Sequence, residues 1–177
     1  IVPDGELRWM GARRTENLLT YSEDFSNAVW TTLSAPTLTT GVEDANGGLT
    51  AVTATATAAF QNFRHVNLVG EIGRTYLSTA YIRRRTGTGD ITFTTARNLV
   101  TAITVTDDWQ KISVLSAPLD NTIIYYLITI TTAGDEIDVC FPQIEDVTNQ
   151  SIKTAAEYIP TTDAPVTKWF DTAQPTA

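Results

Sequence analysis

The sequence predicts an all-β fold, an antiparallel two-sheet β-sandwich, on three observations. Threonine occurs 32 times in 177 residues, and with Val, Ile, Tyr and Phe it supplies the β-branched and aromatic side chains that suit a pleated, half-buried surface. About nine short strand-like segments follow one another, with turn residues at intervals of about ten residues. An apolar content of 42% allows one hydrophobic core, and no repeat of about 20 to 50 residues indicates a solenoid or a propeller.

The first part of the chain is predicted to lead from an arm into the core. Residues 1–16 mix arginines with single apolar residues and show no regular period, so we predict an N-terminal arm or linker. Residues 17–21 predict a short strand. Ser22 is then expected to cap a brief helical turn that runs through Trp30. Phe25 and Trp30 are expected to cover one end of the core.

The middle of the chain is predicted to be a series of strands. Residues 31–57 alternate small, Thr and apolar residues around a turn cluster at residues 43–48, which predicts two strands and a loop. Further strands are predicted at residues 60–68, 76–84, 91–96, 99–105, 109–116, 122–131 and 136–144. The pair at 91–96 and 99–105 is predicted to form a hairpin.

The last two strands carry the most specific predictions. Residues 122–131 have apolar side chains on both faces of the pleat, which predicts either a central strand or a subunit contact. In residues 136–144, the alternation places Ile137, Val139 and Phe141 on one face. Pro142 suits an edge strand or a bulge. Residues 147–177 lose the pattern and are predicted to form an extended C-terminal tail, so the sandwich domain is predicted to span residues 17–146.

Composition excludes several classes of partner. A formal net charge of −8 disfavours a nucleic acid, because phosphate binding requires a clustered excess of Lys and Arg. The single cysteine, Cys140, excludes an internal disulfide. No apolar run approaches the roughly 20 residues that span a bilayer, so no membrane role is expected. An initiator methionine is not normally removed before an isoleucine such as Ile1, so a fragment of a longer protein is one interpretation of this sequence.

The residue types that carry catalysis are scarce. The single histidine, His65, is interpreted as a surface or half-buried strand residue, and no G-x-S-x-G motif is present. Cys140 is interpreted as a small core or interface residue, and one Cys with one His excludes a four-ligand zinc site. The acidic pairs at residues 107–108 and 135–136 are interpreted as turn residues. We therefore expect no enzyme activity.

Two segments carry a resemblance to a known class of proteins. Residues 12–30, ARRTENLLTYSEDFSNAVW, resemble the opening "ARR..NLLTYSEDFSNAAW" of a widespread class of phage and prophage structural proteins. Residues 142–148, PQIEDVT, and residues 156–161, AEYIPT, are similar to the closing "PQ(V/I)EDVT…SEYIPT" of the same proteins. The order and the spacing match over residues 12–162, although the middle of the chain is divergent.

The resemblance implies a jelly roll like that of carbohydrate-binding modules, with extended N- and C-terminal arms. It further implies a non-enzymatic structural or decoration module of the virion, in a head or tail appendage, that contacts other virion proteins. A homo-oligomer is implied, and trimers are the common phage solution. The alternative is a carbohydrate-binding, receptor-recognition domain of a tail fibre with a host-surface glycan as its partner.

The resembling jelly rolls place the first and last strands side by side, which suggests a structural Ca²⁺ as the one cofactor to consider. Four carboxylates would then approach one another and supply the oxygen ligands that Ca²⁺ prefers: Glu23, Asp24, Glu145 and Asp146. The alternative is that these acids cap a helical turn or face solvent, since no calcium-loop spacing is present.

Contact residues for a glycan or a protein partner are drawn from the aromatic and polar strand positions. Jelly-roll modules stack sugar rings on exposed aromatic side chains and bind hydroxyl groups through polar ones, and the available residues are Phe60, Gln61, Asn62, Arg64, Tyr76, Tyr81, Tyr125 and the run Arg83, Arg84, Arg85. The arginine run either meets an acidic partner surface or is a solvated strand end. Trp169 and Phe170 are expected to contact a neighbouring subunit.

Overall fold

The computed structural model describes residues 12–171 apart from residues 35, 66–67, 97–98, 119–123 and 151–152. Within these residues the regular elements are twelve strands: β1 (Ala12–Asn17), β2 (Trp30–Leu33), β3 (Thr37–Val42), β4 (Ala51–Thr55), β5 (Gln61–His65), β6 (Tyr76–Thr86), β7 (Ile91–Ala96), β8 (Leu99–Ile103), β9 (Gln110–Ser116), β10 (Ile124–Ile130), β11 (Glu136–Asp146) and β12 (Val166–Asp171). This part of the chain contains no helix with the length and apolar character that crossing a bilayer requires.

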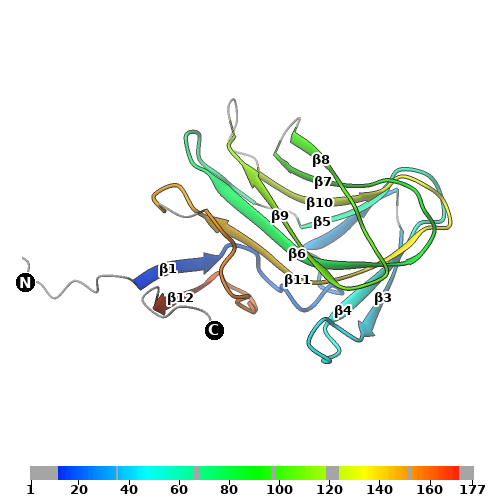
Figure 1. The fold of residues 1–177 in the computed structure, drawn as a ribbon, viewed down its shortest axis with the longest axis horizontal. Coiled ribbons are helices and arrows are strands. Elements are labelled where there is room, and N and C mark those ends of the chain that lie inside the picture. Colours follow the sequence, from blue (N-terminus) through cyan, green and yellow to red (C-terminus); the bar gives the residue numbers. More distant parts are fainter. Residues whose placement is uncertain are drawn as a thin grey trace, which may run out of the picture.

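Ten of these strands form two five-stranded antiparallel sheets that pack face to face (Figure 1). The first sheet has the order β2-β5-β10-β7-β8, and the second has the order β3-β4-β11-β6-β9. The chain passes from one sheet to the other at β9, β10 and β11 in turn, as expected of a jelly roll. The all-β, two-sheet, jelly-roll-like sandwich predicted from the sequence is therefore confirmed.

β10 shows how the alternation builds the core. It is the middle strand of the first sheet. Of the two predictions for residues 122–131, a central strand or a subunit contact, the central strand is confirmed. Its inward side chains, Ile124, Tyr126, Ile128 and Ile130, are all buried. The Tyr126 hydroxyl donates to the Thr79 carbonyl oxygen of β6 at 2.8 Å, which ties the two sheets together. Burial raises the pKa of Tyr126 well above its ordinary value.

Phe25 and Trp30 cover one end of this core, as predicted. Both side chains are buried, and their ring centroids are 4.8 Å apart. The segment between them differs from the prediction, because it forms consecutive turns in place of a helical turn. Asp24 and Asn27 hold these turns: Asp24 accepts from the Ser26 amide and Asn27 accepts from the Val29 amide, each at 3.1 Å. Ser22, the expected cap, lies outside these contacts.

Pro142 lies at a bulge in β11, the middle strand of the second sheet. The register with β6 shifts between Cys140 and Gln143, and the pairing with β4 ends at Val139. The proline therefore costs the sheet no ladder hydrogen bond on the β4 side. The bulge also changes the alternation, since Phe141 has a φ of 53° and packs on the outer side of the sheet. Our prediction that Phe141 shares a face with Ile137 and Val139 was wrong for this reason.

The two ends of the described chain form a separate two-stranded ribbon. β1 pairs with β12 in antiparallel register from Ala12–Asp171 to Asn17–Val166. Residues 12–16, which we expected in an arm, are therefore part of a strand, and residues 17–21 are not the strand we predicted. The partner strand lies some 150 positions away, and no local pattern predicts such a pairing. In Figure 1 the ribbon lies at one end of the long axis, opposite the β6–β7 turn.

Candidate functional site

The two segments that carry the phage resemblance contact each other in the fold. Asn17, which is fully buried, donates through Nδ2 to the carbonyl oxygens of Pro142 at 3.2 Å and Ile159 at 2.8 Å. Its Oδ1 accepts from the amides of Leu19 and Ile144, both at 3.2 Å. One side chain thus joins β1, the β11 bulge and the segment after β11.

Ser22 makes a second connection of the same kind. Its hydroxyl is hydrogen-bonded to the Tyr158 hydroxyl at 2.7 Å and accepts from the Thr161 amide at 2.9 Å. Burial is the main cause that raises the pKa of Tyr158 above its ordinary value. We call the set Asn17, Ser22, Gln143, Glu145, Tyr158 and Thr161 the terminal clasp. These polar residues hold the fold together, so a binding site has to be sought elsewhere.

The four carboxylates considered for Ca²⁺ do not come together. Glu145 is fully buried in the clasp, where it accepts from Gln143 Nε2 at 2.8 Å and from the Ala156 amide at 3.0 Å. Asp146 forms an ion pair with Arg74 at 3.0 Å. Asp24 holds its own turn.

Partial burial, and to a lesser degree the charge of Asp44, raise the pKa of Glu23 above its ordinary value. Across the described part of the chain, no three His, Cys, Asp or Glu side chains form a group that could hold a metal ion.

The residues considered for glycan contact are divided among several surfaces. Gln61 is buried and accepts from the Thr57 amide at 2.7 Å, and Tyr76 lies in the core with its hydroxyl accepting from the Glu71 amide at 2.8 Å. Phe60 is exposed in the turn before β5. Asn62, Arg64 and Tyr125 lie on the solvent side of the first sheet, because β5 and β10 alternate with Phe63 and Tyr126 inward.

Three other residues of the set meet on the solvent side of the second sheet, which we call the outer face. Tyr81, Arg83 and Arg85 alternate along β6 with inward-facing residues such as Ile82. Arg84 points to the other side and pairs with Asp135 at 2.8 Å. The arginine run is therefore not a uniform basic patch, and all three guanidinium groups form ion pairs within the chain.

Asp138 organises the polar half of the outer face. Its side chain is 0% exposed, although it lies on the solvent side of the sheet. The carboxylate accepts from Thr53 Oγ1 at 2.6 Å, from Arg83 Nε at 2.8 Å and from Arg85 Nη1 at 3.1 Å. Each guanidinium keeps further N–H donors beyond these contacts. Two arginines are thereby fixed in position by one buried acid.

Aromatic side chains form the other half of the outer face. The Arg83 guanidinium lies 4.6 Å from the ring centroid of Trp109. The Tyr81 and Phe141 rings meet edge to face at 5.8 Å, and the Phe141 and Tyr158 rings are 4.8 Å apart. We call Tyr81, Trp109, Phe141 and Tyr158 the aromatic platform. Its buried member, Phe141, packs with Ala51 and Cys140 in a small apolar cluster that is separate from the main core.

Part of the outer face is covered by the chain itself. The segment after β11 crosses it, where Lys111 Nζ donates to the Ala156 carbonyl oxygen at 3.0 Å and Gln143 Nε2 donates to the Glu157 carbonyl oxygen at 3.4 Å. Tyr81, Arg83 and Trp109 are left partly exposed beside this segment. An antiparallel sheet normally presents polar side chains to solvent, so rings beside fixed arginines make the outer face the candidate site.

Sequence reasoning missed several residues of this site. Thr53, Trp109 and Asp138 fell within segments predicted to hold strands but were not considered for binding. A carboxylate between Ile137 and Val139 was the available signal for Asp138. No comparable signal marked Trp109, because its partner Arg83 lies 26 positions away in the sequence.

Cys140 and His65, which the sequence analysis set aside as catalytic candidates, are both buried in the structure. Cys140 is buried, and burial is the main cause that raises its pKa to about 12. His65 is 5% exposed, so it is more buried than the surface or half-buried position we predicted. Its Nε2 lies 3.1 Å from the Thr20 carbonyl oxygen, and its ring meets Trp30 edge to face at 5.1 Å.

Comparison with protein families and with curated sequences finds no match. No protein-family model matches the chain. No curated protein matches its sequence.

Solved structures do match. The xylan-binding domain CBM22-1 of Paenibacillus barcinonensis Xyn10C has a TM-score of 0.56 at 19% identity, over 75% of this chain and 92% of that one. The C-terminal family 22 carbohydrate-binding module of Clostridium thermocellum Xyn10B has a TM-score of 0.51 at 14% identity, over 78% and 94%.

A third similar structure comes from a phage. The enzymatically active domain of tailspike protein 4 of bacteriophage CBA120 has a TM-score of 0.54 at 15% identity. The match covers 72% of this chain but 21% of the tailspike chain. At these identities the similarity shows a shared jelly-roll sandwich of the carbohydrate-binding-module type and no more.

Proposed function

We propose that this protein is a carbohydrate-binding module without enzyme activity, and that it binds a glycan on its outer face. The observation that carries the proposal is the meeting of the aromatic platform with the buried Asp138 and its two arginines. Sugar-binding surfaces combine rings that stack on pyranose faces with polar groups that fix the hydroxyls, and this surface offers both.

The arrangement is suited to binding because it is fixed in advance. Asp138 holds Arg83 against Trp109, so a ligand does not have to order either side chain when it binds. The remaining guanidinium N–H groups donate to sugar hydroxyls, and the exposed parts of the Tyr81 and Trp109 rings contact the ring carbons. No metal ion takes part in this proposal.

The source of the protein is part of the same proposal. The resemblance of residues 12–30 and 142–161 to phage structural proteins supports a virion component, and the shared fold with a phage tailspike domain is consistent with it. We propose that the chain belongs to a tail fibre or tailspike and that its ligand is a glycan of the host surface. This function was the alternative in the sequence analysis, and the outer face now makes it the first choice.

A glycan array followed by titration of the best ligand tests the proposal. The wild-type protein is expected to bind one class of glycans, and Trp109→Ala is expected to weaken binding by about tenfold, which corresponds to roughly 1.4 kcal/mol of lost stacking. Trp169→Ala removes an exposed indole outside the site and serves as the matched control. An array without any bound glycan, or equal affinity of Trp109→Ala and wild type, would contradict the proposal.

A second candidate function is assembly with copies of itself or with other virion proteins. The specific observation is Trp169, which is 68% exposed on β12, the outer strand of the terminal ribbon. Phe170 follows it in the strand and pairs through its backbone with Arg13. A large exposed ring on a strand that pairs with β1 alone among the described strands favours contact with another chain.

Light scattering of the purified protein tests this second function. A mass of two or more chains is expected for wild type, and Trp169→Ala is expected to shift the mass toward that of one chain. Trp109→Ala, which changes a ring on another surface, should leave the mass unchanged. A single-chain mass for wild type, or an unchanged oligomer in Trp169→Ala, would contradict a role of this residue in assembly.

A further inference from the structure

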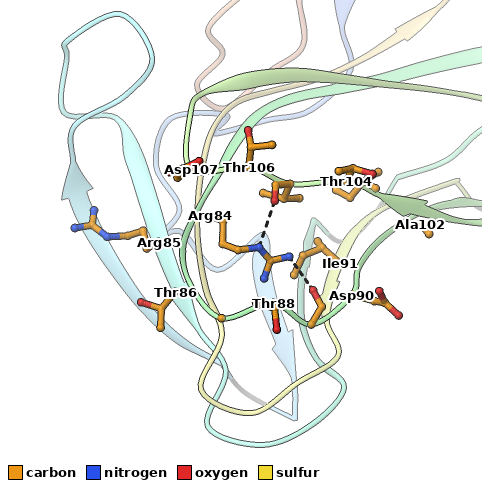
Figure 2. Close-up of a pocket in the computed structure, with 14 residues that line it drawn as sticks. Arg84, Arg85, Thr86, Thr88, Asp90, Ile91, Ala102, Thr104, Thr106 and Asp107 are labelled. Carbon is orange, nitrogen blue, oxygen red and sulfur yellow. Dashed lines mark hydrogen bonds between the residues drawn. The ribbon is translucent and has the colours of Figure 1, made fainter.

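A hollow of about 660 Å³ lies at the end of the sandwich where β6 leads into β7. One side is formed by residues 84–91, and the other by residues 102–107, which run from the end of β8 into the connection to β9 (Figure 2). This volume is within the range of roughly 300 to 1,000 Å³ that is usual for small-molecule sites. The β6–β7 turn, which forms part of the first side, lies at the opposite end of the long axis from the β1–β12 ribbon in Figure 1.

One buried ion pair fixes both sides of this end hollow. Arg84 Nη1 pairs with Asp135 Oδ2 at 2.8 Å, and Asp135 also accepts from the Gly89 amide at 2.8 Å. Arg84 Nη2 donates to the Gly89 carbonyl oxygen at 2.7 Å, and Nε donates to the Val105 carbonyl oxygen at 3.3 Å. The Arg84 amide bonds to the Thr106 carbonyl oxygen at 2.6 Å. Figure 2 shows Arg84 extending between the two loops.

Two glycines bring the β6–β7 turn directly against Asp135. Gly87 has a φ of +87°, and a Cβ added there would lie 1.8 Å from Asp135 Oδ1. A Cβ added at Gly89 would lie 2.2 Å from Thr132 Oγ1. A buried ion pair is weak evidence for a gain in stability, because its desolvation offsets much of the attraction. It does make the hollow rigid, and a rigid concavity loses less entropy when a ligand binds.

The side chains that line the end hollow favour hydrogen bonding over stacking. Its lining includes no aromatic ring, and besides Arg84 and Arg85 its polar side chains are Thr86, Thr88, Thr104, Thr106, Asp90 and Asp107. Neither Asp90 nor Asp107 forms a side-chain hydrogen bond or an ion pair with any residue that the structure describes. Asp135 matches the charge of Arg84, and Asp138 is shared by Arg83 and Arg85, so one arginine charge remains beside the hollow. Because the two carboxylates of Asp90 and Asp107 outnumber it, the end hollow has a net negative charge.

We propose that the end hollow is a second ligand site, separate from the outer face, for a neutral or amino-bearing sugar. The carboxylates of Asp90 and Asp107 accept hydrogen bonds from sugar hydroxyl or ammonium groups, and the threonine hydroxyls complete the contacts. Ile103 provides the apolar wall for the ring carbons, and the buried side chains of Ile91 and Val105 lie beneath it. The same two carboxylates repel a sugar that carries its own carboxylate. This site does not depend on the proposed function of the outer face.

Backbone NMR titrations with galactose, glucosamine and glucuronate test the proposal, because the three sugars are similar in size but differ in charge. Galactose or glucosamine is expected to shift the amide signals of residues 86–90 and 104–107, whereas glucuronate is not. The double substitution Asp90→Asn and Asp107→Asn is expected to reduce these shifts at least fivefold without lowering the melting temperature. Tyr81→Ala, which changes the outer face, should leave them intact, as should Glu71→Gln at an exposed acid elsewhere.

Three results would contradict the second site. The amides of residues 86–90 and 104–107 could fail to respond to any of the three sugars, they could respond equally to glucuronate, or the shifts could persist in the double variant. A response that disappears in Tyr81→Ala would place the binding on the outer face. If no glycan binds on the array but the end hollow responds in the titration, the proposal for the outer face is contradicted and the second site is supported.

Discussion

At the scale of single residues, Asp138 holds the polar half of the outer face in position. Its carboxylate is fully buried and bound by two arginines and a threonine, so removal of the acid would leave two cations without their partner. Sequence reasoning selected Tyr81 as an aromatic strand residue, and Arg83 and Arg85 as members of an arginine run. It did not find Asp138, because the contact joins positions 53 to 55 residues apart and no local pattern records it.

Cys140 provides a test of the outer face that needs no ligand. It is the single cysteine of the chain, it is buried beneath the aromatic platform, and its pKa is raised to about 12. Because the thiolate is the reactive form, the folded protein is expected to react with a thiol reagent at pH 8 far more slowly than the protein in denaturant. Absorbance of the released product measures both rates. Rapid, complete reaction of the folded protein would contradict the burial of this face.

Asp44 is expected to make stability depend on pH. Burial alone would raise its pKa, but hydrogen bonds from the Thr50 hydroxyl and from the amides of Asn46, Thr50 and Gly48 lower it overall. A lowered pKa means that the ionised form stabilises the fold above the unfolded pKa of about 3.9, and that this contribution is lost as the pH falls through the folded value.

Substitution of Asp44 tests this dependence. Asp44→Asn is expected to lower the free energy of unfolding by about 2 kcal/mol at pH 6, because hydrogen bonds to a charged acceptor are replaced by weaker ones. The deficit should shrink once the pH is below the folded pKa of Asp44. Thermal unfolding followed by circular dichroism between pH 2.5 and 6, with exposed Glu43→Gln as the control, measures it. A deficit that is constant across this range would contradict the assignment.

At the scale of elements, the terminal clasp joins the two segments that carry the resemblance to phage proteins. Asn17 and Ser22 in the first segment bind Ile159 and Thr161 in the second, and the β11 bulge at Pro142 lies between them. A bulge was one of two interpretations of the proline, and it is the one observed. The β1–β12 pairing could not be predicted, since strands so distant in sequence leave no local signature.

Asn17→Ala is expected to destabilise the protein by about 3 kcal/mol or more, because four buried backbone groups lose their partner at once. Urea unfolding measures the change, and Asn46→Ala, at an exposed turn position, is the matched control. Wild-type stability in Asn17→Ala would show that the clasp does not hold the termini. The variant should still bind a glycan below its unfolding midpoint, because Asn17 does not lie on the outer face.

At the scale of the whole molecule, the alternation of apolar residues and the spacing of turns predicted the fold class, because burying one face of each strand requires that pattern. Fold class does not select a function, since one jelly roll carries many kinds of site. The site follows from which side chains three strands place on one face, and that depends on register. A one-residue change in register at β11 already moved Phe141 from the expected inner side to the aromatic platform.

The central claim is that the outer face of the β3-β4-β11-β6-β9 sheet binds a glycan. Chemical-shift mapping with the best ligand from the array tests it most directly, because the backbone amides report every surface of the protein in one experiment. The account predicts that the largest shifts occur at Thr53, Tyr81, Arg83, Trp109 and Asp138. Largest shifts on the first sheet or on the terminal ribbon would contradict it.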